Sequence, residues 1–281
     1  YLGLLVFPIM MIGFMSNVIA AAGASYARLG AVLMAPPAER RERSTAELKG
    51  EIRLEGVTLE FGEKKALNNV SFTVAPGTKT AIIGPTAAGK TQLLNVLIGL
   101  LKATSGKVLY DGIPIEDYDP ESLRRQVALV FQDSALFNLT LRENIAFSNS
   151  VSDASLEKAI RAAELQGYVD GLPQKLDTIV SERGTTLSGG QKQRAMLARA
   201  LALNPKVLLL DDFTARVDTN TEQAILRNVE ASYPGITLIS VTQKIASVEH
   251  YDQIILLMEG EVLAIGTHAE LMQSSRSEEH T

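Results

Sequence analysis

Hydrophobic residues are distributed in two different ways along the chain, and the first is a continuous apolar stretch. Residues 2–22, LGLLVFPIMMIGFMSNVIAAA, carry no Asp, Glu, Lys or Arg, and the first charged side chain is Arg28. A helix of about this length crosses a bilayer. Pro8, Ser16 and Asn17 are costly facing lipid but are tolerated facing other helices or a cavity. The pattern predicts a membrane helix, and the alternative is a buried helix of a soluble protein.

Basic residues follow this stretch, and no acidic residue precedes the first of them. They are Arg28, Arg40, Arg41 and Arg43. Such an excess is expected where a membrane helix ends on the cytoplasmic side. We therefore expect residues 1–34 to be the end of a membrane helix with its cytoplasmic extension, and residues 35–50, rich in proline and charge, to be a linker. Because the chain opens with Tyr1, we expect it to begin inside a longer protein.

From residue 51 onward the apolar residues occur in short runs, as in a globular α/β domain. Residues 51–61 and 70–74 alternate apolar and polar positions and predict half-buried strands. Four continuous apolar runs predict strands covered on both faces, and therefore a parallel sheet flanked by helices. These runs are residues 80–85, 127–131, 206–212 and 235–243. Residues 253–267 predict a hairpin that turns at Glu259 and Gly260.

Helical periodicity lies between the predicted strands. In residues 152–165, SDASLEKAIRAAEL, Leu156, Ile160 and Ala163 share one helix face. We expect the polar residues 274–281 to form a disordered tail.

Composition narrows the function classes. The net charge of -5 and the pI near 5.4 argue against a nucleic-acid partner, because such proteins are usually basic. The absence of cysteine excludes disulfides and thiolate metal sites. The three histidines form no ligand-spaced pair, which argues against zinc.

Residues 84–91, GPTAAGKT, fit G-x-x-x-x-G-K-[ST] between a predicted strand and a predicted helix. The backbone N–H groups of such a loop and the helix N-terminus wrap phosphates. Lys90 adds charge at the β- and γ-phosphates, and the Thr91 hydroxyl can ligate Mg²⁺. The sequence predicts a nucleotide phosphate site; the alternative is a glycine-rich turn with a surface lysine.

Two carboxylates end the apolar run KVLLLDD. The strand delivers Asp211 to the carboxyl edge of the sheet, where ligands bind in open α/β sheets. There Asp211 can hold Mg²⁺, directly or through water. Asp212 points elsewhere, toward the γ-phosphate and an attacking water, which is the place for a general base. The alternative for both is a solvated strand end or a helix cap.

Residues 187–191, LSGGQ, identify the family that the chain resembles. With the phosphate loop upstream, they resemble the ATP-binding half of an ABC transporter, specifically an exporter whose membrane helices precede the nucleotide domain in one chain. The ERG at residues 182–184 is typical of such exporters. The resemblance implies an α/β fold, with a P-loop NTPase (RecA-like) core, an antiparallel β subdomain and an α-helical signature subdomain, preceded by a transmembrane helix segment. The nucleotide-binding domain would span residues 51–273, with the helical subdomain at about 134–200.

The residues of the signature are suited to binding an anion. Ser188 can cap the following helix, and the two glycines let the helix N-terminus approach an anion closely. The resemblance implies that this anion is the γ-phosphate of ATP bound to another nucleotide domain, so that two domains sandwich two ATPs head to tail.

Individual positions match the family's motifs. Phe61 matches the aromatic that stacks on adenine, with a core phenylalanine as the alternative. Gln132 matches the glutamine that touches Mg²⁺ and couples to the membrane domain, and Asp218 ends the D-loop. The residues expected to contact ATP are Phe61, Gly84, Thr86, Ala87, Ala88, Gly89, Lys90, Thr91 and Gln92 and, for the partner's nucleotide, Ser188, Gly189, Gly190 and Gln191. Those expected to hold Mg²⁺ are Thr91, Gln132 and Asp211, and those expected to act in catalysis are Asp212, Gln243 and Gln132.

The chain departs from the family pattern around one ATP. Asp212 stands for the catalytic glutamate, Gln243 for the switch histidine, ARVD at 215–218 for SALD, and Ala87 for glycine. The shorter Asp212 retracts its carboxylate by one C–C bond, about 1.5 Å. A misplacement of about 1 Å can cost on the order of a hundredfold in rate. Gln243 cannot carry the charge of an imidazolium.

These departures predict a site that binds ATP but hydrolyses it slowly. Since LSGGQ is intact and serves the partner's ATP, we expect a heterodimer with a second ABC half-transporter. The alternatives are a homodimer with Asp212 as a slow base, and neutral substitution. Further expected partners are the bilayer and the coupling helices of the transmembrane domains.

The expected location is the cell (inner) membrane, with the nucleotide domain in the cytoplasm. Other function classes are a soluble ABC ATPase of DNA repair or translation, against which the apolar stretch argues, and a kinase or GTPase, against which LSGGQ argues. A regulatory nucleotide-binding subunit without turnover is a further alternative.

Overall fold

The computed structural model describes residues 1–34, 43–133, 135–147, 150–180, 187–213, 217–244 and 247–278. The chain divides into two units, Tyr1–Glu42 and Arg43–Thr281. The ERG at 182–184, Ala215 and Arg216 of the D-loop, and residues 35–42 of the expected linker lie outside the described residues.

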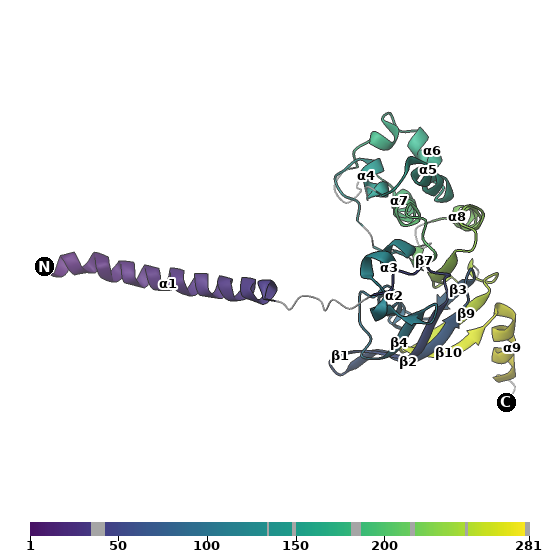
Figure 1. Ribbon diagram of the computed structural model, residues 1–281, viewed down its shortest axis with the longest axis horizontal. Coiled ribbons are helices and arrows are strands. Elements are labelled where there is room, and N and C mark those ends of the chain that lie inside the picture. Colours follow the sequence, from purple (N-terminus) through teal and green to yellow (C-terminus); the bar gives the residue numbers. More distant parts are fainter. Residues whose placement is uncertain are drawn as a thin grey trace. The chain divides into compact units, whose positions relative to one another are not determined.

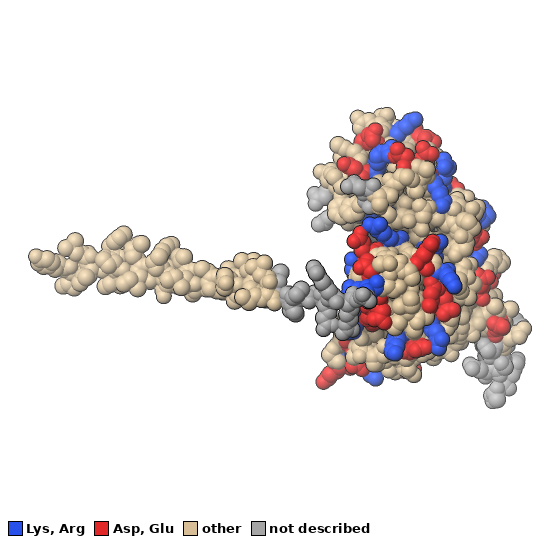
Figure 2. Space-filling model, in the orientation of Figure 1, with Lys and Arg blue, Asp and Glu red and all other residues tan. Residues whose placement is uncertain are grey.

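The described part of the first unit, residues 1–34, contains α1 (Leu2–Leu33), which confirms the predicted helix. Its segment Leu2–Gly30 has a mean hydropathy of 2.1 and is long and apolar enough to cross a membrane. Figure 2 shows neither acidic nor basic side chains on the visible face of the described part of this helix. The helix therefore has the length and composition that the sequence predicts for a membrane span.

The second unit is built around a six-stranded sheet with the order β10-β9-β3-β8-β7-β6 (Figure 1). Its strands are β3 (Lys79–Ile83), β6 (Val127–Val130), β7 (Val207–Asp211), β8 (Thr237–Val241), β9 (Gln253–Met258) and β10 (Glu261–Gly266). The neighbouring strands β9, β3, β8, β7 and β6 pair in parallel, and β10 pairs antiparallel with β9. The parallel sheet and the hairpin that turns at Glu259 and Gly260 are confirmed.

The continuous apolar runs exist because both faces of this sheet are covered. Leu208 and Leu210 of β7 belong to a core cluster with residues of α5 (Asp153–Ala162), α7 (Gly189–Leu201) and α8 (Thr219–Ser232). Val207 and Leu209 face the other way, into a cluster with α2 (Lys90–Leu97) and a second sheet. Neighbouring residues of one strand thus enter different cores, since side chains alternate along a strand.

The second sheet is antiparallel, with the order β2-β1-β4-β5. Its strands are β1 (Ile52–Phe61), β2 (Lys64–Val74), β4 (Ser105–Tyr110) and β5 (Ile113–Pro114). The predicted strands at 51–61 and 70–74 are β1 and the end of β2. β4 and β5 complete the antiparallel subdomain that the resemblance implies.

Helices gather at one end of this unit in Figure 1. They are α4 (Leu141–Ala146), α5, α6 (Gln166–Asp170) and α7. The remaining described elements of the unit are α3 (Pro120–Gln126), α9 (His268–Glu278) and two 3₁₀ turns, Ile115–Asp117 and Lys175–Asp177. The predicted apolar face of α5 is confirmed, because Leu156, Ile160 and Ala163 are all buried. On the face that Figure 2 shows, charges of both signs are interspersed over the described part of this unit.

The expected linker is wrong for residues 43–50, which belong to the globular unit. The Asp111 carboxylate accepts hydrogen bonds from the N–H groups of Lys49, Gly50 and Glu51 at 2.6, 3.2 and 2.9 Å. Leu48 is buried, and its N–H donates to Gln126 Oε1 at 2.7 Å. The sequence pattern could not reveal this, because the partners of the segment lie far away in the chain.

The expected disordered tail at 274–281 is wrong for residues 274–278, which continue α9. The helix begins beside Thr267, whose N–H donates to Glu270 Oε2 at 2.7 Å. This N-terminal hydrogen bond helps to form a helix that the polar sequence does not announce.

Candidate nucleotide-binding site

The predicted phosphate loop joins β3 to α2. Gly89, with φ of 96°, directly precedes α2, and a Cβ there would collide with the Ala66 carbonyl oxygen. Only glycine fits such a conformation without strain or displacement. Ala87 also has a positive φ, 66°, at the position where the family usually has glycine. The loop therefore takes the conformation that glycine favours without having glycine at both positions.

Lys90 is folded back onto this loop. Its Nζ donates to the carbonyl oxygens of Gly84 and Pro85 at 2.8 and 2.7 Å. Burial lowers the pKa of Lys90, and the negative charges of Asp212 and Asp211 oppose that shift. The ammonium group is thus held beside the phosphate loop and close to both carboxylates.

Asp211 ends β7 and is 3% exposed. Burial raises the pKa of its carboxyl group, while a hydrogen bond with the Thr91 side chain and the charge of Lys90 act in the opposite direction. Two of the three residues expected to hold Mg²⁺ are therefore in direct contact. Their oxygen atoms are the donors that Mg²⁺ prefers.

The rest of the metal fit also agrees with Mg²⁺. Within the described residues no three His, Cys, Asp or Glu side chains converge on one point. Mg²⁺ is usually held by one or two protein oxygens, with water and phosphate as the remaining ligands. The pair of Asp211 and Thr91 fits that mode of binding.

Asp212 follows at the carboxyl end of the sheet with φ of 43°. Its N–H donates to the Val241 carbonyl oxygen at 2.9 Å, which fixes the backbone against β8. Its Oδ2 accepts from Gln132 Nε2 at 3.4 Å. The structure thus directs the two carboxylates to different partners, Thr91 and Gln132.

A cavity of about 260 Å³ brings the predicted residues together. Its lining comprises Thr86, Ala87, Ala88, Gly89, Lys90, Thr91, Gln92, Gln132, Asp211, Asp212, Val241, Thr242 and Gln243. These residues lie at or after the carboxyl ends of β3, β6, β7 and β8, because the carboxyl ends of parallel strands share one edge of the sheet. Only Val241 and Thr242 were not singled out from the sequence.

Three of the predictions are not part of this lining: Gly84, Phe61 and the signature. Phe61 ends β1 and is 53% exposed, as a residue available to stack on a ligand would be. Ser188 caps α7: its N–H donates to Gln191 Oε1 at 2.8 Å, and its Oγ accepts from the Gln191 N–H at 3.3 Å. Gly189 and Gly190 form the first turn of the helix. The signature is thus a helix N-terminus outside the chain's own cavity.

Asp218 has a local role. Its side chain caps α8 by accepting from the Thr221 N–H at 3.0 Å, and this bond lowers the pKa of Asp218.

Sequence reasoning missed Gln193, which connects the signature helix to the cavity. Gln193 is buried in α7, and its Nε2 donates to the Gln132 carbonyl oxygen at 2.8 Å. The available signal is weak: an amide between Lys192 and Arg194 on a helix whose buried face is otherwise largely apolar. The contact means that the position of α7 and the backbone at Gln132 depend on each other.

A second buried amide, Asn144, was also missed. Its side chain bonds the backbone of Phe137, Leu139 and Thr140 at distances of 2.8 to 3.2 Å. Arg199 of α7 donates to the Asn144 carbonyl oxygen at 2.6 Å, and burial lowers the pKa of Arg199 to about 10. The segment that follows Gln132 is therefore held against the signature helix.

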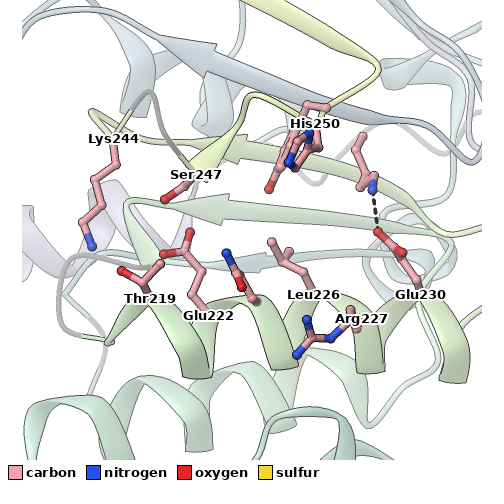
Figure 3. A pocket seen from close by; sticks show the side chains of 11 residues that line it. Thr219, Glu222, Leu226, Arg227, Glu230, Lys244, Ser247 and His250 are labelled. Carbon is pink, nitrogen blue, oxygen red and sulfur yellow. Dashed lines mark hydrogen bonds and ion pairs between the residues drawn. The ribbon is translucent and has the colours of Figure 1, made fainter. Parts of the chain in front are cut away.

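A larger cavity, about 670 Å³, lies elsewhere, between α8 and the segment that leads to β9 (Figure 3). Glu222 and Glu230 line it, and Lys79 pairs with Glu230 at 2.6 Å. The cavity takes side chains from the flank of α8 and no residue of the glycine loop, so it lacks a phosphate cradle. Size therefore does not identify the nucleotide site.

Comparison with known proteins gives a consistent result. Residues 67–215 match the family described as ABC transporter. The chain is 37% identical over 240 residues to the ATP-dependent lipid A-core flippase of Acinetobacter baylyi, covering 84% of this chain and 42% of that protein. It is 38% identical over 248 residues to the mycobactin import ATP-binding/permease protein IrtB of Mycolicibacterium thermoresistibile, covering 87% of this chain and 43% of that protein.

A solved structure is similar along nearly the whole chain. The structure of a bacterial Atm1-family ABC exporter with ATP bound matches with a TM-score of 0.86 and 32% identity, covering 95% of this chain and 48% of that one. The chain thus spans less than half the length of these relatives.

Proposed function

The chain belongs to the ABC transporter family, and we propose on that basis that it is the nucleotide-binding part of an ABC exporter half-transporter. In this proposal it binds Mg-ATP in a head-to-tail dimer and couples ATP binding and hydrolysis to export of a substrate. The observation that carries the proposal is the cavity in which the glycine loop, Lys90, Thr91 and Asp211 meet at one sheet edge.

The proposal assigns separate tasks to the glycine loop, to Lys90, Thr91 and Asp211, and to Phe61 outside the cavity. The loop N–H groups and Lys90 bind the phosphates, and Thr91 and Asp211 hold Mg²⁺. Bound Mg²⁺ would neutralise phosphate charge. Lys90 must then leave the carbonyl oxygens of Gly84 and Pro85, so ATP binding exchanges two internal hydrogen bonds for contacts with phosphate oxygens. Phe61, exposed at the end of β1, stacks on the adenine.

The export direction and the location rest on α1 and the relatives. The Atm1-family exporter matches 95% of the chain. The matched region therefore includes most of α1. One relative is named an importer, so the family name alone does not set direction. We place α1 in the cell membrane, with the nucleotide domain in the cytoplasm beyond Arg28, as the positive-inside rule expects.

An apolar groove supports coupling to a membrane domain. Its volume is about 330 Å³, and it is lined by Leu100, Phe131, Arg199 and Leu203 among others. Phe131 directly precedes Gln132 in the chain. We propose that a coupling helix of a transmembrane domain fills this groove, because an apolar helix face is the usual occupant of such a surface.

We further propose that the chain's own Walker site is degenerate. One carboxylate oxygen of Asp212 already accepts a hydrogen bond from Gln132. The side chain is also shorter than that of glutamate, so it positions a water less close to the γ-phosphate. Gln243 lines the cavity without a positive charge. The capped signature, by contrast, keeps every residue of LSGGQ and serves the partner's ATP. A heterodimer satisfies both observations, and a homodimer with Asp212 as a slow base is the second candidate.

Copurification tests this proposal. The full gene product is tagged in its native cell, extracted in mild detergent, and the proteins present at equal stoichiometry are identified by mass spectrometry. The heterodimer requires a second ABC half with Glu and His at the positions of Asp212 and Gln243. Recovery of this chain alone would reject the heterodimer and leave the homodimer to be tested through ATP turnover.

The same preparation separates the remaining classes. ATP turnover by the assembled dimer distinguishes a transporter from a regulatory subunit that only binds nucleotide. Recovery in the soluble fraction without detergent would instead favour a soluble ABC ATPase.

A further inference from the structure

Thr242 lines the nucleotide cavity, yet neither the sequence motifs nor the proposed function gives this residue a task. It directly follows β8 and is 2% exposed, whereas the next residue, Gln243, is exposed. The chain therefore leaves the core between these two residues. The bonds that hold the backbone at this point decide where the Gln243 side chain can lie.

Two backbone hydrogen bonds fix the chain just before it leaves the core. The Val241 carbonyl oxygen accepts from the Asp212 N–H at 2.9 Å. The Thr242 N–H donates to the Ile82 carbonyl oxygen of β3 at 3.2 Å. The end of β8 is thus tied both to β3 and to the residue that follows β7, at the carboxyl edge of the sheet.

The Thr242 side chain then closes a turn around Gln243. Its Oγ1 accepts a hydrogen bond from the Lys244 N–H at 3.1 Å. A threonine oxygen that bonds the backbone N–H two residues later forms a local turn of this kind. Because the bond spans Gln243, it restricts the backbone dihedral angles of that residue. The direction of the Gln243 side chain therefore depends on the hydroxyl of its neighbour.

This turn directs two consecutive side chains to different cavities. Gln243 lines the nucleotide cavity together with Lys90, Asp211 and Asp212. Lys244 lines the larger cavity beside α8, where its side chain is drawn in Figure 3. A turn with other dihedral angles would not keep Gln243 among the residues that face the phosphates.

We propose that Thr242 is a positioning residue that holds the Gln243 amide toward the γ-phosphate of ATP in the nucleotide cavity. The inference rests on the proposed function, since it requires ATP in that cavity. Gln243 has no positive charge that attracts a phosphate, so its contact depends on geometry. Fixing the backbone that carries the amide in advance reduces the entropy lost when the contact forms.

The test measures the release of ATP from the full gene product, purified in detergent with the partner that assembles with it. If that partner is a second ABC half, its glycine-loop lysine is replaced by alanine, so that retained ATP belongs to this chain's cavity. The assembly is loaded with Mg-ATP labelled at the α-phosphate and chased with unlabelled ATP. Filter binding and thin-layer chromatography give the rate at which labelled ATP is lost.

Thr242→Val replaces the hydroxyl by a methyl group of similar size. We expect ATP to dissociate about fivefold faster, as the loss of one hydrogen bond predicts. Thr242→Ser keeps the oxygen and should release ATP at nearly the unaltered rate. Thr242→Ala removes the same oxygen without a branched replacement and should match Thr242→Val.

Gln243→Ala distinguishes positioning from a general structural role. By itself it should also accelerate ATP release, and in that background Thr242→Val should add nothing, because Thr242 acts through Gln243. The matched control is Thr237→Val, since Thr237 is a buried threonine of β8 whose hydroxyl donates to the Gly50 carbonyl oxygen at 2.9 Å. It should lower the midpoint of thermal unfolding and leave ATP release unchanged.

The proposal is overturned if Thr242→Val releases ATP as slowly as the unaltered chain, or if Thr242→Ser releases it as fast as Thr242→Val. It is also overturned if Gln243→Ala leaves the rate unchanged, or if the effects of the two substitutions add. Equal acceleration by Thr237→Val would mean that lost stability explains the result. An unaltered assembly that retains no ATP would reject the proposed function itself, and this inference with it.

Discussion

The nucleotide cavity and the start of α7 are the two surfaces of this chain that would meet ATP, and they differ in how well their residues suit that task. In the cavity, Ala87 and Asp212 are non-glycine residues with φ of 66° and 43°. At the start of α7, Ser188 and Gln191 complete a reciprocal capping box. The cavity thus has a left-handed backbone conformation at two residues that carry side chains, which is unfavourable. The start of α7 has a complete set of capping hydrogen bonds.

The difference indicates that selection acts differently on the residues of the nucleotide cavity and on those of the signature. Neutral substitutions would be expected at both surfaces. All but one of the departures from the family pattern, however, lie in the chain's own nucleotide cavity. The remaining one, ARVD in the D-loop, ends at Asp218, which still caps α8. This contrast supports our proposal that the chain presents an intact signature to a partner while its own site holds ATP.

The largest expected effect comes from closing the phosphate cradle. Gly89→Ala places a Cβ against the Ala66 carbonyl oxygen at φ of 96°, so the loop must shift. We expect ATP affinity to fall on the order of a hundredfold, since two backbone hydrogen bonds to a charged phosphate are worth about 1.5 kcal/mol each. Fluorescent ATP-analogue titration measures the change. Gly62→Ala is the control, because Gly62 has φ of 63° but nothing within 4 Å of its Cβ position. Equal affinities in the two variants would contradict the assignment of the cradle.

The next largest effect is expected when the family's catalytic residues are restored in the nucleotide cavity. Asp212→Glu combined with Gln243→His should raise ATP turnover at this site by about a hundredfold, because the carboxylate regains the reach that about 1 Å of misplacement removes. Turnover is measured in the assembled dimer with the partner's catalytic glutamate inactivated. No increase would show that the cavity is slow for another reason.

Asp212→Asn, in a dimer with an intact partner, sharpens the same comparison. In a heterodimer we expect most turnover to persist, since the partner's site carries it. Complete loss of turnover would identify Asp212 as the working base and favour the homodimer.

A smaller effect tests the signature side. Ser188→Ala removes the N-cap of α7 and should cost about 1 kcal/mol of unfolding free energy. Because α7 serves the partner's ATP in our proposal, turnover of the dimer should also fall. Ser152→Ala is the matched control: Ser152 caps α5 through the Ser155 N–H at 3.1 Å. It should show a similar loss of stability in chemical denaturation with no change of turnover. A parallel fall of turnover in both variants would mean that stability alone explains the effect.

The smallest effect concerns backbone strain in the loop. Ala87→Gly should raise the unfolding free energy by about 0.5 kcal/mol, since relief of left-handed strain exceeds the added entropy of the unfolded chain. Ala88→Gly is the control, because Ala88 is buried and has no positive φ, and it should destabilise the protein. Urea denaturation compares the two, and a destabilised Ala87→Gly chain would show that the strain is negligible.

Local patterns were sufficient to predict the elements that carry their own signal. Runs such as KVLLLDD reveal a strand buried on both faces, because each residue must be apolar whichever core it enters. The phosphate loop and LSGGQ combine glycine, a cap and a charge within a few residues. Their positions could therefore be predicted, and of the glycine-loop residues expected to contact ATP the structure brings all but Gly84 into the lining of one cavity.

Interactions between distant residues could not be predicted in this way. Asp111 holds the N–H groups of Lys49, Gly50 and Glu51, and a pattern limited to the polar segment 43–50 indicates only a linker. Gln193 is equally silent, because a glutamine on a helix becomes informative only when its partner, the Gln132 carbonyl oxygen, is in view.

The sequence by itself determined the family resemblance, the membrane-type helix, the alternating βα order and the chemistry of the nucleotide cavity. These features depend on periodicity and on residues close together in the chain. The tertiary structure alone decided where the second unit begins and how α7 is linked to Gln132. The reason is physical: hydrogen bonds, burial and charge proximity are properties of groups that folding brings together, and sequence spacing does not encode them.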